Sequence, residues 1–213
     1  MENIIEIRSL KKCFEKHKIL DDISADFEKG KIYGIIGRNG SGKTVLFKCI
    51  CGLMHYDAGE ILINGKKIGV DIDIAENVGA IIENPGFLPY YSGAANLKML
   101  MGICGKKDKD RIYKCMKMTG LDPDDKKHVC KYSLGMRQRL GISQAIMDDP
   151  DILLLDEPMN GLDNKGVDEM RALFLQLKQQ SKTILLSSHN REDIDLLCDV
   201  VYEMENGKMK RNR

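Results

Sequence analysis

The sequence predicts an α/β fold: a mainly parallel sheet covered by helices, joined to an antiparallel β region and interrupted by a helical insertion. Three observations lead to this prediction. In the second half of the chain, short apolar stretches that read as buried strands alternate with helical stretches, a pattern typical of parallel sheets. A glycine-rich loop at residues 37–44 stands between an apolar strand and a helix. From Gly93 to about Pro150 the apolar spacing is helical throughout.

The first third of the chain reads as antiparallel strands around one helix. Residues 4–7 begin a strand, and we expect a hairpin with one arm at 11–20 and its return at 23–27. Residues 28–30 form a turn into the next strand. The other elements expected here are a strand at 31–36, a helix at 45–51, a strand at 59–65, a short buried strand at 80–82 and a turn at 83–86.

Helices and buried strands alternate along the rest of the chain. Ser133 is a good N-cap residue for a helix at 134–147. The final segment, 200–204 followed by Asn206-Gly207, predicts a hairpin. The other elements expected here are helices at 94–101, 109–118, 165–180 and 191–198 and strands at 151–156 and 183–187.

Length and composition indicate a single domain, or one core that carries a small subdomain. The chain has 213 residues, of which 43% are hydrophobic, enough for a substantial core. Its 33 Lys and Arg nearly balance its 32 Asp and Glu, so the net charge favours no nucleic-acid partner. The basic residues 208–213 are interpreted as a solvated tail.

The sequence contains no run of about 18 apolar residues and no apolar core of a signal peptide near its start. We therefore expect a protein of the cytoplasm. The cysteines lack paired C-x-x-C spacing, which favours buried thiols in a reducing compartment over a metal site. These are Cys13, Cys49, Cys51, Cys104, Cys115, Cys130 and Cys198.

Residues 37–44 match the pattern G-x-x-x-x-G-K-[ST] of a phosphate-binding loop. Small residues let successive backbone N–H groups turn toward one anion, and the helix that follows points its positive end there. Lys43 can reach the outer phosphates, and the Thr44 hydroxyl can bind Mg²⁺. The alternative is a glycine-rich turn with a solvated lysine.

A second motif places acids at the end of a buried strand. Four apolar residues, 152–155, lead into Asp156 and Glu157. Asp156 is well placed to hold Mg²⁺, and Glu157 can accept a proton from an attacking water. His189 follows the next buried strand, where a neutral imidazole could contact the γ-phosphate or orient Glu157; a structural histidine is the alternative.

Ser133 and Gly135 open a helix whose first turn carries no Asp or Glu. Such an N-terminus is another site for an anion. One chain would then hold two phosphate-binding surfaces but only one general base. A head-to-tail dimer resolves this, with each nucleotide held between the loop of one chain and the Ser133 helix of the other.

These motifs resemble those of the nucleotide-binding subunits of ABC transporters, and the resemblance covers essentially the whole chain. Residues 37–44 are similar to the family's Walker A motif, 152–157 to Walker B and 132–138 to the signature, usually L-S-G-G-Q. Residues 160–163 resemble the D-loop, and His189 the H-loop. The resemblance implies nucleotide contacts from Phe14, Gly37, Arg38, Asn39, Gly40, Ser41, Gly42, Lys43, Thr44, Val45, Ser133, Gly135, Met136 and Asp163.

Phe14 stands where the family places an aromatic side chain that stacks on adenine; a residue of a strand core is the alternative. The signature departs from the family pattern, because Leu134 and Met136 stand in place of glycine and glutamine. Ser133 and Gly135, the positions that face phosphate, are kept.

Glu83 is the second departure, since most of the family has glutamine at this position, where it contacts Mg²⁺ or water. A carboxylate binds a hard cation better than an amide but is repelled by the γ-phosphate. Glu83 is therefore expected to assist Thr44 and Asp156 at the metal and to take part in catalysis with Glu157 and His189.

The resemblance further implies a RecA-like P-loop core. We expect one domain, 1–213, with the core and β subdomain at 1–85 and 148–213 and a helical subdomain at about 86–147. Residues 86–91 would dock on a separate membrane-spanning permease subunit. The cofactors would be ATP and Mg²⁺, and the protein would lie on the inner face of the cell membrane.

The segment 83–86 together with 132–136 is similar to the branch that handles bacteriocins, lantibiotics and bacitracin-like peptides, for export or self-protection. Two alternatives stay open. Some ABC-type ATPases act on ribosomes or DNA, although these usually carry two nucleotide units or a long coiled coil. A plain phosphate-loop kinase would need neither the Ser133 motif nor His189.

Overall fold

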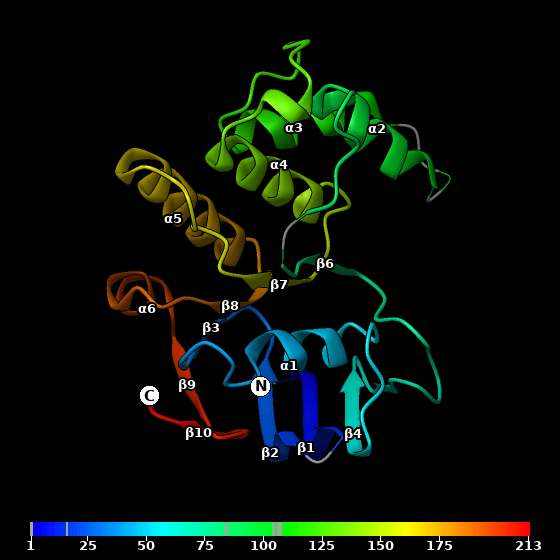
Figure 1. Ribbon diagram of the computed structural model, residues 1–213, viewed down its shortest axis with the longest axis vertical. Coiled ribbons are helices and arrows are strands. Elements are labelled where there is room, and N and C mark those ends of the chain that lie inside the picture. The colour runs from blue at the N-terminus through cyan, green and yellow to red at the C-terminus, as the bar shows by residue number, and fades with distance from the viewer. Residues whose placement is uncertain (1, 16, 84, 104, 106–107) are drawn as a thin grey trace.

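The computed structural model describes residues 2–213 except 16, 84, 104 and 106–107. Asn84 of the predicted turn and Cys104 of the cysteine set therefore lie outside the described residues. Figure 1 shows helices α2, α3 and α4 at one end of the molecule and strands β1, β2 and β4 at the other. Helix α1 and the strands of a second sheet lie between them. The helices are α1 (Lys43–Ile50), α2 (Gly93–Ile103), α3 (Lys109–Met118), α4 (Leu134–Ile146), α5 (Asn164–Gln179) and α6 (Arg191–Leu197), with a short 3-10 helix, η1 (Val129–Lys131).

The larger sheet is parallel except at one edge. Its order is β10-β9-β3-β8-β7-β6, and only β10 runs antiparallel to its neighbour among the described strands. β7 lies between β6 and β8, so the strand that ends in the acidic pair occupies an inner position. The strands are β3 (Ile32–Ile36), β6 (Val78–Ile81), β7 (Ile152–Asp156), β8 (Thr183–Ser187), β9 (Val200–Glu205) and β10 (Lys208–Arg211).

The smaller sheet is antiparallel, with the order β2-β1-β4-β5. Two core clusters explain how the layers assemble. On β7, Ile152 and Leu154 join the core that includes Phe47 of α1 and the smaller sheet, whereas Leu153 and Leu155 join the helices on the other face. Both faces of β7 are therefore buried, which is why it reads as a continuous apolar run. The strands are β1 (Asn3–Phe14), β2 (His17–Glu28), β4 (Ala58–Ile63) and β5 (Lys66–Lys67).

These features confirm the predicted α/β class, with a parallel sheet, an antiparallel β region and an inserted set of helices. Ser133 is the N-cap of α4, as predicted, and its side chain accepts a hydrogen bond from the Met136 backbone N–H. Among the described residues, no helix has the length and apolarity needed to cross a bilayer. The domain boundaries at 85 and 147 stay a prediction.

The predicted hairpin turn near residues 21–22 is wrong. β1 continues to Phe14 and the chain reverses before His17. Leu10 pairs with Ile23 but Lys12 pairs with Leu20, so β2 carries one extra residue there. Asp22 has a left-handed φ of 61°. Asp21 and Asp22 lie in a β-bulge, which favours the same residue types as a turn.

The interpretation of residues 208–213 as a solvated tail is also wrong. Lys208–Arg211 form β10, which pairs with β9. Beyond it, the Arg213 guanidinium donates a hydrogen bond to the Cys198 carbonyl oxygen at 2.6 Å. An edge strand tolerates basic side chains because they stay in solvent and discourage pairing with other chains.

Gly79 of β6 is the point where the parallel sheet and the inserted helices meet most closely. A Cβ atom at this residue would lie 1.9 Å from the carbonyl oxygen of Ala145 in α4. We predict that Gly79→Ala lowers the free energy of unfolding by about 1–3 kcal/mol, because β6 and α4 must move apart. Urea unfolding followed by circular dichroism measures this.

Gly102→Ala is the matched control, because nothing lies within 4 Å of a Cβ at that position of α2. It should leave stability unchanged or raise it slightly, since alanine favours a helix over glycine. Equal unfolding midpoints for the two variants would contradict the close approach of β6 and α4.

Candidate active site

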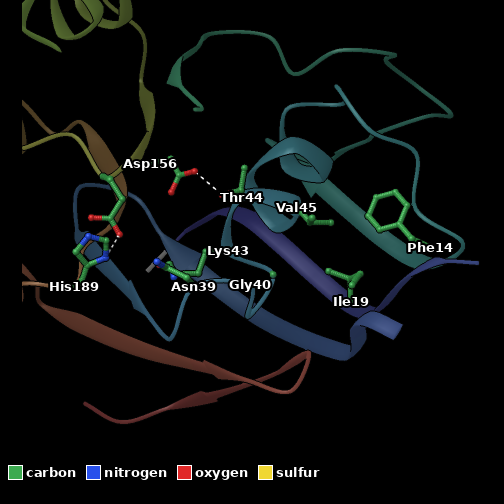
Figure 2. Close-up of a pocket in the computed structure, with 11 residues that line it drawn as sticks. Phe14, Ile19, Asn39, Gly40, Lys43, Thr44, Val45, Asp156 and His189 are labelled. Carbon is green, nitrogen blue, oxygen red and sulfur yellow. Dashed lines mark hydrogen bonds and ion pairs between the residues drawn. The ribbon is translucent and has the colours of Figure 1, made fainter. Parts of the chain in front are cut away.

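A cavity of about 430 Å³ opens where β3 and β7 end, in the crevice where open α/β sheets bind ligands. Figure 2 shows Phe14 and Ile19 at one end of this cavity and Asp156 and His189 at the other. The lining combines an apolar end with a strongly polar one. The lining residues are Phe14, Ile19, Asn39, Gly40, Gly42, Lys43, Thr44, Val45, Asp156, Glu157 and His189.

The glycine-rich loop joins β3 to α1, as the sequence predicts. Gly42 is the N-cap of α1 with a φ of 106°, a backbone conformation that favours glycine. A Cβ on Gly37 would lie 2.4 Å from the carbonyl oxygen of Met204, and one on Gly42 would lie 2.9 Å from that of Ile19. The first turn of α1 carries no acid, so its positive end is free to face an anion.

Lys43 is buried and its ammonium folds over the loop. It donates hydrogen bonds to the carbonyl oxygens of Gly37 at 2.7 Å and of Arg38 at 3.2 Å. The Ser41 hydroxyl is buried and finds no hydrogen-bond partner among the described residues. A cation and an unpaired hydroxyl in one loop are the groups that a phosphate would satisfy.

Thr44 and Asp156 bring two oxygen ligands together. The Thr44 hydroxyl donates to Asp156 Oδ2 at 2.6 Å. On the neighbouring strand, the Ser187 hydroxyl donates to Asp156 Oδ1 at 2.6 Å and fixes that carboxylate. A hydroxyl beside one held carboxylate fits Mg²⁺, which binds few protein oxygens and takes the rest from phosphates and water.

The backbone N–H and the backbone carbonyl group of Glu157 both form hydrogen bonds. Its N–H donates to the Ser187 hydroxyl at 3.0 Å, and its carbonyl oxygen accepts from Gln138 Nε2 at 3.2 Å. Its φ of 51° is uncommon for a residue other than glycine and costs about 1–3 kcal/mol. These two bonds hold the residue in a strained conformation that directs its side chain into the cavity.

The Glu157 carboxylate contacts the imidazole of His189. Its Oε1 lies 2.7 Å from His189 Nδ1, the contact drawn in Figure 2. Burial raises the pKa of Glu157, and Asp156 adds to this effect, whereas His189 and Lys43 oppose it. A carboxylate with a raised pKa is a stronger proton acceptor.

His189 is positioned through its neighbour Ser188. The Ser188 hydroxyl donates to Asp193 Oδ2 at 3.2 Å, and Arg171 of α5 donates to Asp193 Oδ1 at 2.6 Å. Asp193 is almost fully buried, with its side chain 4% exposed. This chain of contacts ties the loop that carries His189 to α5 and α6.

Phe14 closes the apolar end of the cavity. It is 44% exposed at the end of β1, so the alternative reading as a residue of the strand core does not hold. Ile19 and Val45 complete this end. A partly exposed aromatic ring beside two aliphatic side chains suits a planar, apolar base.

Several predicted site residues lie outside the cavity lining. Asp163 is the N-cap of α5 and accepts from the Gly166 N–H at 3.0 Å. Gly135 lies against the chain near Gly161, because a Cβ there would be 3.0 Å from the Gly161 carbonyl oxygen. The residues outside the described lining are Gly37, Arg38, Ser41, Glu83, Ser133, Gly135, Met136 and Asp163.

Leu134 joins the start of α4 to the loop that follows Glu157. A Cβ on Gly161 would lie 2.4 Å from Leu134 Cδ2, and Gly161 has a φ of 76°. Leu134 is also 57% exposed. The Ser133 helix and the loop at 160–163 therefore form one continuous surface away from the cavity.

Glu83 forms an ion pair with Lys48 of α1, with Lys48 Nζ 2.7 Å from Glu83 Oε1. The pair is not part of the cavity lining in the described chain. The expected contact of Glu83 with the metal stays a prediction.

Sequence reasoning missed Ile19, Ser187 and Gln138. Ser187 ends a strand whose pairing with β7 sets it opposite Asp156, so aligning the two apolar strands by their last residues would have found it. Gln138 and Ile19 carry no comparable signal, because their roles depend on how α4 and β2 pack.

The profile of one known family, described as ABC transporter, matches residues 20–160. This chain belongs to the ABC transporter family. The match confirms the family that the sequence motifs resemble. The chain is an ATP-binding subunit with ATPase activity.

Three relatives cover nearly the whole chain. The ABC transporter ATP-binding protein YybJ of Bacillus subtilis is 44% identical over 97% of this chain and 95% of its own length. The bacitracin transport ATP-binding protein BcrA of Enterococcus faecalis is 38% identical over 98% of this chain and 68% of its own. The lantibiotic transport ATP-binding protein SrtF of Streptococcus pyogenes is 34% identical over 97% and 89%. These names confirm the resemblance to the bacitracin and lantibiotic branch.

Solved structures agree on the fold. The dimeric structure of MJ0796, a bacterial ABC transporter cassette, gives a TM-score of 0.87 at 20% identity and covers 98% of this chain and 99% of that one. At this identity the similarity shows the fold alone.

The raised pKa of Glu157 predicts the acid limb of ATP hydrolysis. Glu157 accepts a proton only when ionised, so turnover falls as pH drops through its pKa. We expect the midpoint of this fall on the alkaline side of 4.5, the ordinary value for glutamate. The rate of phosphate release at saturating ATP across the acid pH range measures this.

His189→Asn separates the two groups of the pair. Because His189 lowers the pKa of Glu157, its loss should move the acid limb of the residual turnover to higher pH. A limb that disappears in this variant belongs to the histidine, and the assignment to Glu157 is then wrong.

Proposed function

We propose that the cavity between Phe14 and His189 binds ATP, and that its hydrolysis drives a transporter of bacitracin- or lantibiotic-type peptides through a separate membrane subunit. The observation that carries this proposal is one cavity that unites Lys43, Thr44, Asp156, Glu157 and His189. Together these supply a phosphate-binding cation, metal-binding oxygens and a general base, the groups that phosphoryl transfer to water requires.

At the apolar end, Phe14 stacks on the adenine base, and Ile19 and Val45 exclude water from it. At the polar end, the backbone N–H groups of residues 38–44 receive the phosphates. Lys43 exchanges its bonds to the Gly37 and Arg38 carbonyl oxygens for stronger, charge-assisted bonds to phosphate oxygens.

Thr44 and Asp156 would hold Mg²⁺, and the Ser187 hydroxyl fixes the Asp156 carboxylate for this role. When bound, the metal neutralises charge on the phosphate oxygens. We also assign Glu83 to this edge of the sheet, where its carboxylate would supply an additional hard oxygen for the metal.

Glu157 accepts a proton from the water that attacks the γ-phosphate. Its backbone bonds to Ser187 and Gln138 hold it in place, so the carboxylate is pre-oriented before ATP binds. His189 contacts the carboxylate and keeps it directed at the water, and it senses the γ-phosphate from the same position.

A second subunit completes the site in a head-to-tail dimer. Ser133, Gly135 and Met136 at the start of α4 contact the γ-phosphate bound by the other chain, together with the loop that contains Asp163. Three features support this: none of these residues lines the described cavity, α4 has no acid in its first turn, and the cassette MJ0796 is described as dimeric.

Glu157→Gln tests the dimer. The variant retains the shape of the side chain but loses the base, so it should bind ATP and accumulate as an ATP-stable dimer. Gel filtration with and without ATP measures this, and Lys43→Ala is the matched control that should bind ATP poorly and stay monomeric. A wild-type monomer that hydrolyses ATP at the full rate would contradict the shared site.

The membrane subunit docks on the helical subdomain, about 86–147, while 1–85 and 148–213 form the core and β subdomain. Large apolar side chains are exposed in this region, and exposed apolar side chains of this size suit a contact with a protein partner. In this proposal the chain lies on the inner face of the membrane. The exposed large apolar residues between 86 and 147 are Leu88, Tyr90, Tyr91, Met99, Ile103 and Leu134.

The partner and substrate are tested together. From detergent-extracted membranes, the tagged chain should co-purify with a protein of several apolar spans, and bacitracin or a lantibiotic should raise the ATPase rate of the complex. A double change, Leu88→Ser with Tyr90→Ser, should abolish the association.

Val70→Ser is the control, because Val70 is 73% exposed in the loop after β5 of the smaller sheet. This change should not affect the association. Co-fractionation with ribosomes, or with DNA, in place of a membrane protein would favour the alternative class of ABC-type ATPase.

A further inference from the structure

The ion pair between Lys48 and Glu83 joins the nucleotide-binding helix to the segment that leads into the helical insertion. Lys48 Nζ lies 2.7 Å from Glu83 Oε1, with side-chain exposures of 26% and 61%. The Glu83 backbone has a left-handed φ of 61°. Two residues later, Pro85 lies against Gly141 of α4, where a Cβ would be 2.8 Å from Pro85 Cγ.

The pair lies on elements related to those that carry the metal-binding oxygens: Lys48 is on α1 with Thr44, and Glu83 follows β6, the neighbour of the strand that ends in Asp156. Ile81 of β6 pairs with Leu155 of β7, so Glu83 and Glu157 each follow a paired position by two residues and leave neighbouring strands at the same edge of the sheet. Lys48 follows Thr44 by four residues on α1, which places the two side chains on one face of the helix. Thr44 is the residue that contacts Asp156.

Glu83 thus has two possible cationic partners: the ammonium of Lys48 and a metal ion that Thr44 and Asp156 would hold. A carboxylate is a strong ligand for a hard cation. While it is paired with Lys48, however, the same oxygen is occupied. The two partners compete for one carboxylate.

We propose that Lys48 is a positioning residue that holds Glu83 back from the metal site, so that release from Lys48 is required before Glu83 joins Thr44 and Asp156. This rests on the proposed function.

Metal affinity in a double-mutant cycle tests the proposal. The variants are Lys48→Met, Glu83→Gln and both together, and the probe is Mn²⁺ as a paramagnetic substitute for Mg²⁺, counted by electron paramagnetic resonance in the presence of ATP. An exposed ion pair changes an equilibrium by about twofold to fivefold. Lys48→Met should therefore tighten Mn²⁺ binding in the chain that keeps Glu83. This effect should be about threefold larger than the effect of the same change in the Glu83→Gln variant.

The cycle removes the simple effect of charge, because Lys48→Met deletes the same positive charge in both backgrounds. Equal effects in the two backgrounds would overturn the proposal. Loss of stability without this coupling would do the same, since it marks a structural role alone. Failure of the wild-type chain to bind ATP would instead refute the proposed function.

Lys66→Met is the matched control. Lys66 pairs with Glu76 at the same 2.7 Å distance, but at β5 of the other sheet. It should leave Mn²⁺ affinity unchanged in both backgrounds, and a change equal to that of Lys48→Met would overturn the assignment to the Lys48–Glu83 pair.

Discussion

The hydrogen bond from Thr44 to Asp156 joins two parts of the chain that are 112 residues apart, and the cavity depends on it. Thr44 belongs to α1, which packs between the two sheets, and Asp156 ends an inner strand of the parallel sheet. Only the correct order of strands brings these residues together. The order of the strands is fixed by the packing of their apolar faces, which contributes about 25 cal/mol for each Å² removed from water. Apolar packing therefore sets the geometry of the polar site, although no apolar side chain contributes a polar atom to it.

The polar end of the cavity concentrates charge in a confined volume. Asp156 and Glu157 are consecutive, and each is held by the Ser187 hydroxyl on the adjacent strand. Lys43 and His189 lower the pKa of Glu157 and so limit how far burial raises it. Only adjacent strands of fixed register can deliver so many polar groups to one point.

Much of the fold and of this polar end could be predicted from the sequence. The apolar run before Asp156 and the pattern of residues 37–44 each combine a local conformation with its chemistry, so short stretches were sufficient. The β-bulge at Asp22 could not be distinguished from a hairpin turn, because bulges and turns favour the same residue types and only the strand pairing separates them. The partners of Glu83 and Glu157 on α1 and α4 were also out of reach, since Lys48 and Gln138 act through tertiary contacts that no periodicity records.

The contact between Leu134 and Gly161 has a consequence for how two cassettes work together. This contact ties the start of α4 to the loop after Glu157. In the proposed dimer it therefore joins the surface that one chain offers to its partner's nucleotide to the general base that acts on the chain's own nucleotide. In the proposed dimer, one site cannot loosen without disturbing the general base of its twin. The contact of Leu134 with Gly161 would therefore couple the two sites of the proposed dimer through the interior of each chain.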